Sequence, residues 1–275
     1  MCLITFSYQQ HPKYPFIMVA NRDEFYKRSS SAMAFWQDHC EILAGRDLEK
    51  QGTWLGLHTS GKLSAVTNYR NALHTPQQPL LSRGQLITQS LLTEHSSVDF
   101  LDTLAPRFDQ YGPCSLLTGD QHGLYFASNQ PVSSDQSVTS NTPRRLAPGI
   151  YGLCNASLDT PWPKLLDAKA QLQQLLSEPQ IRLAQLQRIL NDNRTTPEQN
   201  LPNTGIAKNW ERSLSAQFIQ LENYGTRAKS IILQHLSGKT EICEISYDRI
   251  GVINESYFEL QLPLIGGSIN KSYYQ

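Results

Sequence analysis

Cys2 is the residue of this chain best suited to covalent chemistry. It follows Met1 directly and opens the apolar stretch CLITF, and cysteine is scarce, with 5 among 275 residues. Removal of Met1 would leave Cys2 with a free α-amine beside its thiol. An α-amine has a pKa of about 7.7–8.0, so it can act as the base that activates the thiol as a nucleophile. The alternative is a small apolar side chain at the head of a buried strand.

Groups that would assist such a thiol follow the next apolar run. The segments Leu3–Tyr8 and Phe16–Ala20 predict a β-hairpin, which would bring the motif NRDE (residues 21–24) beside Cys2. In that position Asp23 is expected to orient the amine, and Arg22 to lower the pKa of the thiol. Alternatively, NRDE is only a salt-bridged turn at the end of a strand.

Two asparagines lie where apolar runs stop. They are Asn68 in AVTNYR and Asn155 in GLCNAS. A side-chain amide at a strand end is a suitable donor to an oxyanion. The alternative for each is a turn-forming asparagine.

Composition excludes several classes of function. Lys+Arg and Asp+Glu are both 24, so the whole chain has no overall attraction for nucleic acid or for an anionic membrane. No apolar run approaches the roughly 20 residues of a membrane-spanning helix. The five scattered cysteines form no C-x-x-C pair, which predicts reduced thiols and a cytoplasmic location. Dinucleotide, P-loop and zinc-protease motifs are missing, and the histidines show no ligand spacing, so no cofactor or metal is expected for hydrolysis.

Strands and helices are predicted in blocks rather than in alternation. Apolar runs predict strands before residue 70 and over 114–154, and each block is followed by two helices. The first helices start at Ser82 and Ser96, which have capping-box spacing, and the later ones start at Thr160-Pro161 and near Ile181. The segments AQFIQL, KSIILQHL and EICEISY predict further strands, and the polar segment 191–205 predicts a rim or lid. This order predicts one α+β domain over residues 1–275, with helix pairs outside stacked sheets.

A set of motifs distributed along the chain resembles one family. In order they are MCLITF, ANRDEF, GRD, GTWLGL, TNYRN, SRG, YGLCNASLDTPWPK and YGTRAKSIIL. Together they are similar to the NRDE-motif family, also called the transport and Golgi organisation protein 2 family, from Met1 to about Tyr247. The resemblance implies a four-layer αββα sandwich of the N-terminal nucleophile hydrolase type.

By analogy, the choloylglycine hydrolases and penicillin V acylases suggest which residues would form a catalytic site. Those enzymes use a leading Cys, an early Arg and Asp, two Asn residues and a late Arg. Similar places are occupied here by Cys2, Asp23, Asn68 (the looser match), Asn155 and Arg227. The acylases space their early pair as R-x-x-D, which puts Ala20 where their arginine falls. Arg22 is the candidate substitute, because residues two apart in an extended strand face the same way.

Two functions therefore remain open. The first is an N-terminal cysteine amidohydrolase acting on a non-peptide amide or acyl substrate. The second, implied by the family, is a haem-trafficking or acyl-CoA/lipid-binding protein on a hydrolase-like scaffold, with haem as bound cargo. For acyl-CoA, the segment 82–84 at a helix start would bind phosphate, helped by Arg70 and Arg46. In either case the partner is a small molecule, with no nucleic acid and no integral membrane segment.

Overall fold

The strands of the computed structural model form two antiparallel sheets, within described residues 2–72, 81–130 and 142–267. In spatial order the first sheet contains β10 (Gly149–Leu153), β1 (Cys2–Tyr8), β2 (Phe16–Phe25), β11 (Tyr224–Gln234), β12 (Lys239–Tyr247) and β13 (Val252–Gln261). The second contains β3 (Ser30–Phe35), β4 (Ile42–Asp47), β5 (Leu55–His58), β6 (Leu63–Asn68), β7 (Cys114–Asp120), β8 (Gly123–Ser128) and β9 (Arg144–Arg145).

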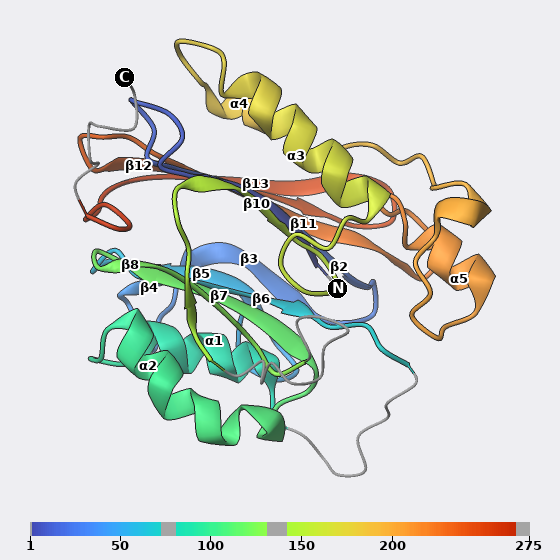
Figure 1. Cartoon of the computed structure of the whole chain (residues 1–275), viewed down its shortest axis with the longest axis horizontal. Helices are drawn as coiled ribbons and strands as arrows, with labels where there is room; N and C mark the ends of the chain where they lie inside the picture. Colours follow the sequence, from blue (N-terminus) through green and yellow to red (C-terminus); the bar gives the residue numbers. More distant parts are fainter. Residues whose placement is uncertain (1, 73–80, 131–141, 268–275) are drawn as a thin grey trace.

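The helices lie outside this pair of sheets (Figure 1). They are α1 (Arg83–Leu92), α2 (Ser97–Leu104), α3 (Pro163–Leu175), α4 (Leu183–Leu186) and α5 (Lys208–Ser213), with 3₁₀ helices at Ala105–Gln110 and Glu198–Asn200. None of the helices within the described ranges is long and apolar enough to cross a membrane.

Side chains of the central strands point alternately to the two faces of the first sheet, and both faces are buried. Phe6 of β1 and Met18 of β2 belong to the core between the sheets, with Leu117 of the second sheet. Their neighbours Leu3 and Val19 face the other way, because successive side chains of a strand point to opposite faces. The first sheet therefore has one face against the second sheet and the other against helices.

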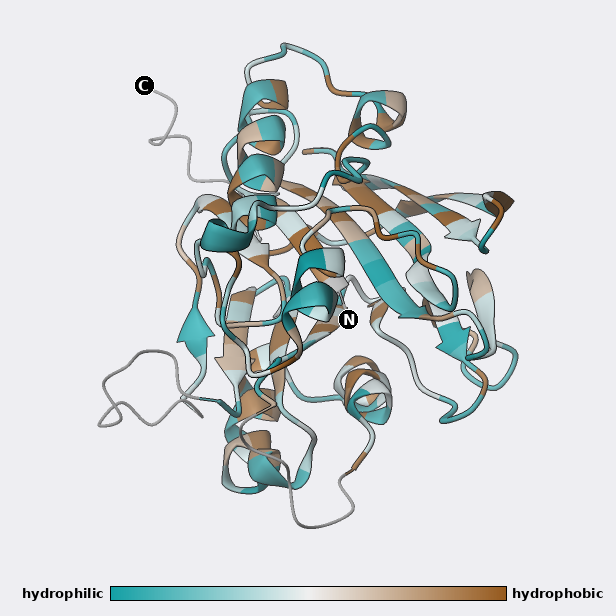
Figure 2. Cartoon of the chain, turned by 90° about the vertical axis from the view of Figure 1, so that its right-hand side faces the viewer, coloured by the Kyte–Doolittle hydropathy of each residue, from teal (hydrophilic) through white to brown (hydrophobic). Residues whose placement is uncertain are grey.

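Each outer face of the sandwich is covered by helices that are apolar on one side (Figure 2). Leu165 and Leu172 of α3 complete the core on the first sheet. Leu86 of α1 and Phe100 of α2 pack with Leu116 of β7 on the second sheet. The expected α+β, four-layer αββα arrangement is thus confirmed.

Helix starts were predicted with mixed success. Ser82 and Ser96 are the expected N-caps, and their side chains accept bonds from the N–H groups of residues 85 and 99. However, α3 begins at Pro163 rather than at Thr160-Pro161. Trp162 is extended (φ −70°, ψ 138°), as a residue before proline prefers to be.

Three other expectations about elements were wrong. The helix near Ile181 is reduced to the single turn of α4. Residues 216–221 (AQFIQL) are not a strand, and β11 begins only at Tyr224. The NRDE motif does not follow a strand, because β2 continues to Phe25. It stays extended since β2 is paired on both sides, with β1 and with β11.

Candidate functional site

Cys2 lies at the first position of β1, where its backbone pairs with Arg22 of β2. Its side chain lies outside the part of the chain that the structure describes. On the other side of β1, Ile4 pairs with Leu153 of β10. β10 ends at Leu153, and Asn155 lies two residues further along the chain. The structure therefore pairs the backbone of Cys2 with one of the residues that the sequence singled out, Arg22.

Asn68 and Asn155 are brought together from different sheets. The side-chain amide of Asn155 donates to the backbone carbonyl of Asn68 at 3.1 Å. The carbonyl of Asn155 accepts from the N–H of Arg70 at 2.8 Å. Asn155 is buried, whereas Asn68 is partly exposed. This junction closes the sandwich at the end of the sheets where β1 begins.

Arg22 and Asp23 face opposite sides of β2, so NRDE does not form one cluster. Asp23 is buried toward the helices, and its Oδ1 accepts from the Thr226 hydroxyl at 2.7 Å. Burial raises the pKa of Asp23, while the charge of Lys164 and the bond from Thr226 oppose that shift. Asn21 shares this face and donates to the backbone carbonyls of Leu190 and Gln217, both at 2.9 Å. Asn21 thus links the sheet to the loops that cover it through these two hydrogen bonds.

Lys164 is a buried charged residue that the sequence analysis missed. It lies in the first turn of α3, and its ammonium donates to the carbonyl of Leu214 at 2.8 Å. Burial lowers its pKa, and the charge of Asp23 raises it. A lysine in the motif DTPWPK at a helix start was the available signal.

Arg22 points toward the second sheet, on the same side as Ala20, as expected. Its guanidinium stacks on Trp54, 4.3 Å from the ring centroid, and Nη2 lies 3.4 Å from Oδ2 of Asp47. Arg22 is only 5% exposed, and Nη1 has no hydrogen-bond partner among the described residues. The side chain is therefore a buried cation with one donor group unused.

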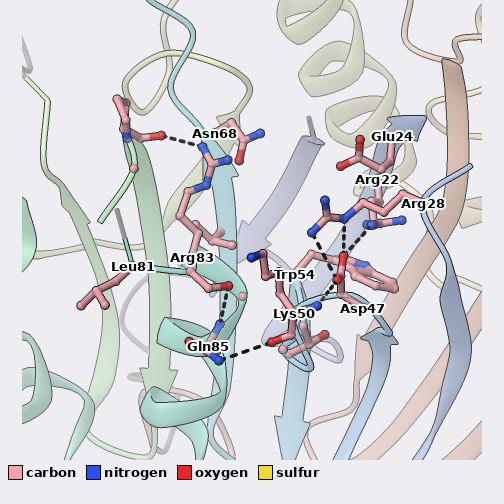
Figure 3. Close-up of a pocket in the computed structure, with 17 residues that line it drawn as sticks. Arg22, Glu24, Arg28, Asp47, Lys50, Trp54, Asn68, Leu81, Arg83 and Gln85 are labelled. Atoms are coloured by element: carbon pink, nitrogen blue, oxygen red, sulfur yellow. Dashed lines mark hydrogen bonds and ion pairs between the residues drawn. The ribbon is translucent and has the colours of Figure 1, made fainter. Parts of the chain in front are cut away.

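Arg22 lines a cleft of about 680 Å³ between the C-terminal end of β2 and the start of α1 (Figure 3). Its charged side chains are four cations and two carboxylates: Arg22, Arg28, Lys50, Arg83, Glu24 and Asp47. Asn68, Trp54 and the first residues of α1 complete the wall. Figure 3 shows Arg22, Arg28 and Asp47 across the cleft from Arg83 and Asn68.

Arg227 is not among the residues that line this cleft. It lies at a bulge of β11, where the register shifts between Thr226 and Ala228. Its Nη1 donates to the carbonyls of Phe25, Tyr26 and Arg28 at 3.1–3.2 Å, and its Nε to that of Tyr247 at 3.1 Å. Arg227 therefore holds the turn that leads from β2 to β3, and with it the backbone of Arg28.

The prediction that Arg70 and Arg46 help to bind phosphate at the helix start is wrong. Arg70 is buried against Glu211, with N···O 3.0 Å, and Arg46 makes a two-pronged pair with Asp38. Neither lines the cleft. The residues that do, Arg28 and Lys50, had no distinguishing motif in the sequence. Across the described ranges, no group of three or more His, Cys, Asp and Glu side chains is placed to hold a metal.

The layers and the cleft define an α+β sandwich with a polar, mostly cationic opening at one end of its central strands. The chain belongs to the Transport and Golgi organisation 2 family, whose match covers residues 1–249. It is 33% identical to a human Transport and Golgi organization protein 2 homolog over 270 residues, covering 90% of this chain and 93% of that one. A Drosophila melanogaster Transport and Golgi organization protein 2 is 25% identical over 284 residues, covering 94% and 98%.

Two solved structures are similar at low sequence identity. One is a Caenorhabditis elegans ortholog of N-acylethanolamine-hydrolyzing acid amidase, with 8% identity and a TM-score of 0.48 over 84% of this chain and 92% of that chain. The other is the C2A mutant of conjugated bile acid hydrolase from Clostridium perfringens, with 9% identity and a TM-score of 0.42 over 96% and 99%. The four-layer description of this chain rests on its own strand pairing and cores.

Proposed function

We propose that this chain is an N-terminal cysteine amidohydrolase that cleaves a non-peptide amide or acyl bond. The observation that supports the proposal is the pairing of Cys2 with Arg22 in the register of β1 and β2, because Arg22 also lines a cleft. The cleft beside Arg22 is where the substrate would bind. Removal of Met1 is a condition of the mechanism, because only a free α-amine at Cys2 supplies the base.

In the proposed reaction, the Cys2 sulfur attacks the substrate carbonyl carbon and its proton passes to the α-amine. The C–N bond then breaks, and the leaving nitrogen takes that proton, which leaves a thioester on Cys2. Water gives a proton to the same amine and attacks the thioester carbon. The C–S bond then breaks, the acid is released, and the Cys2 sulfur takes the proton back from the amine. No cofactor enters these steps.

Other residues have supporting roles in this proposal. One N–H of the Asn155 amide is used by the Asn68 carbonyl, and the second N–H is the candidate donor to the oxyanion. Asp23 would orient the α-amine from the helix side of β2. Its bond from Thr226 keeps the carboxyl group in one position.

The decisive experiment combines mass spectrometry with two substitutions. The mature protein is expected to lack Met1, and turnover of a panel of N-acyl amides is expected to vanish in Cys2→Ala and to fall strongly in Cys2→Ser. Cys40→Ala is the matched control, because Cys40 is an exposed free cysteine and its loss should leave turnover unchanged. Retention of Met1, or equal turnover by Cys2→Ala and wild type, would refute the mechanism.

A carrier for acyl-CoA or haem is the second candidate, favoured by the size and charge of the cleft. A volume of about 680 Å³ with an excess of cations suits a ligand larger than a small amide that also carries anionic groups. None of the described residues that line the cleft is His, Cys, Met or Tyr. Bound haem would therefore use these cations for its carboxylates. Unchanged acyl-CoA or haem binding by Cys2→Ala, with no amide turnover by wild type, would select this candidate.

A further inference from the structure

The unused donor of Arg22 requires a physical explanation. Its guanidinium is buried between β2 and the second sheet, yet Nη1 has no partner among the described residues. A buried charged donor without an acceptor is costly. Such a group in the wall of a cleft indicates an acceptor that arrives with a ligand.

Arg46 is an arginine of the same chain in which both terminal nitrogens are paired. It stacks on Trp36 at 4.3 Å, the same distance as Arg22 on Trp54. Both terminal nitrogens of Arg46 donate to the two oxygens of Asp38 at 2.6 Å. Nε of Arg46 has no partner among the described residues, but both of its terminal nitrogens do. Stacking on tryptophan therefore does not prevent pairing of a terminal nitrogen, and the missing acceptor at Nη1 of Arg22 has another cause.

That cause is the commitment of Asp47 to other donors. Its two oxygens accept from Nε and Nη2 of Arg28 at 2.5 and 3.2 Å. Oδ1 also accepts from the backbone N–H groups of Glu49 and Lys50. Arg22 is left with one hydrogen bond to Asp47, from Nη2 at 3.4 Å.

Glu244 is not the missing acceptor for Nη1 of Arg22 either. The charge of Arg22 acts on this carboxyl group, but its oxygens accept from the N–H of Met33 at 2.6 Å and the hydroxyl of Ser230 at 3.0 Å. Asp47 and Glu244 are therefore already engaged with other donors, and Oε1 of Glu24, which lines the same cleft, accepts from the N–H of Phe25 at 2.9 Å.

The opposite wall of the cleft is the N-terminus of α1. This ten-residue helix has no acidic side chain in its first turn, and residues 82–85 line the cleft. The first N–H groups of a helix lack intrahelical partners and carry the positive end of the helix dipole, so they favour an anion. Lys50, exposed at the same cleft, adds a second cation.

We propose that the cleft contains a subsite for an oxyanion, a phosphoryl or carboxylate group of the ligand, bound between Nη1 of Arg22 and the N-terminus of α1. Lys50 attracts the group to the cleft. The inference deepens the proposed function, on which it rests, by making the substrate an anionic acyl compound. The subsite itself is independent of the thiol.

Isothermal titration with inorganic phosphate, pyrophosphate and hexanoate at fixed ionic strength tests the subsite. At least one of these probes should bind saturably to wild type, and Arg22→Met should weaken that binding by about 10- to 100-fold, the range for a charge-assisted hydrogen bond. Arg46→Met is the matched control and should change it by less than about twofold. Preference for phosphate or for hexanoate identifies the kind of oxyanion.

Lys50→Met covers the case in which Arg22→Met does not fold, because an exposed lysine can be replaced without disturbing the core. It should weaken binding and reduce its dependence on salt. The proposal is overturned if no probe binds saturably, or if Arg22→Met and Arg46→Met bind equally well.

Cys2→Ala separates this inference from the proposed function. It should abolish turnover and keep anion binding. If the wild-type protein binds anions but hydrolyses no amide, the proposed function is refuted and the subsite stands. If it hydrolyses amides but binds no anion, the subsite is refuted and the proposed function stands.

Discussion

The Asn155 side chain joins the two sheets by donating a hydrogen bond to the backbone carbonyl of Asn68 at 3.1 Å. Asn155 follows β10 of the first sheet, and Asn68 ends β6 of the second. Asn155 is buried and Asn68 is partly exposed, so the bond is shielded from water on one side. It therefore contributes to stability at the same place where the proposed chemistry occurs.

Asn155→Ala should lower the free energy of unfolding by about 0.5–1.5 kcal/mol, because the Asn68 carbonyl loses its donor. Urea unfolding measures the change. Asn254→Ala removes an exposed asparagine of β13 and should have little effect. Equal stability of the Asn155 and Asn254 variants would show that the bond between the sheets contributes nothing.

Glu211→Gln should destabilise the fold by about 3–5 kcal/mol, because it leaves the buried charge of Arg70 without its carboxylate. The side chains of this pair are only 7% and 4% exposed. The double variant Arg70→Met/Glu211→Leu should recover much of the loss, since both charges are then gone. Chemical unfolding of the three proteins gives the coupling energy.

The matched control for this pair is Lys208–Glu198, whose side chains are 84% and 63% exposed. Glu198→Gln should cost less than about 1 kcal/mol. If Glu211→Gln costs no more than this, the buried pair is not a determinant of stability.

Gly52→Ala should weaken both the fold and the proposed anion binding. A Cβ at residue 52 would lie 2.3 Å from the carbonyl carbon of Gly84 and 2.6 Å from the N of Gln85, so the start of α1 must move. Overpacking of this kind costs about 1–3 kcal/mol. Gly112→Ala is the control on the same cleft, because its Cβ would have no neighbour closer than 3.6 Å. Thermal unfolding and phosphate titration should separate the two variants, and identical behaviour would contradict the prediction.

Glu244 should make stability depend on pH between about 4.5 and 7. Burial raises the pKa of its carboxyl group from 4.5 to about 7. Between these values the folded chain holds a proton that the unfolded chain has released, so stability falls as pH rises and levels off above 7. The full effect is about 3 kcal/mol, at about 1.4 kcal/mol per pH unit.

Glu244→Gln should remove this dependence while keeping an acceptor for Met33. Unfolding free energies of variant and wild type, measured from pH 4.5 to 8, should diverge in favour of the variant as pH rises. Glu259→Gln on the exposed edge of β13 is the control. Parallel pH profiles for wild type and Glu244→Gln would rule out a titrating Glu244.

Local sequence patterns predicted the elements whose cause is local. The alternation of Leu3–Tyr8 and Phe16–Ala20 predicted the hairpin, and Ser82 and Ser96 predicted two helix starts. These features depend on residues a few positions apart. The end of β2 was wrong for the converse reason, since its pairing with β11 extends the strand through NRDE.

The sequence by itself determined the family, the layered α+β sandwich and the candidates Cys2, Arg22 and Asn155. These follow from residue types, short-range spacing and the order in which strands and helices occur. Only the tertiary structure decided that Arg22 and Asp23 face opposite layers. It also decided that Arg227 holds a turn and that Arg28 and Lys50 replace Arg70 and Arg46 beside α1. Those outcomes depend on which strands pair and which acceptors are already occupied, and both are settled only when distant segments pack together.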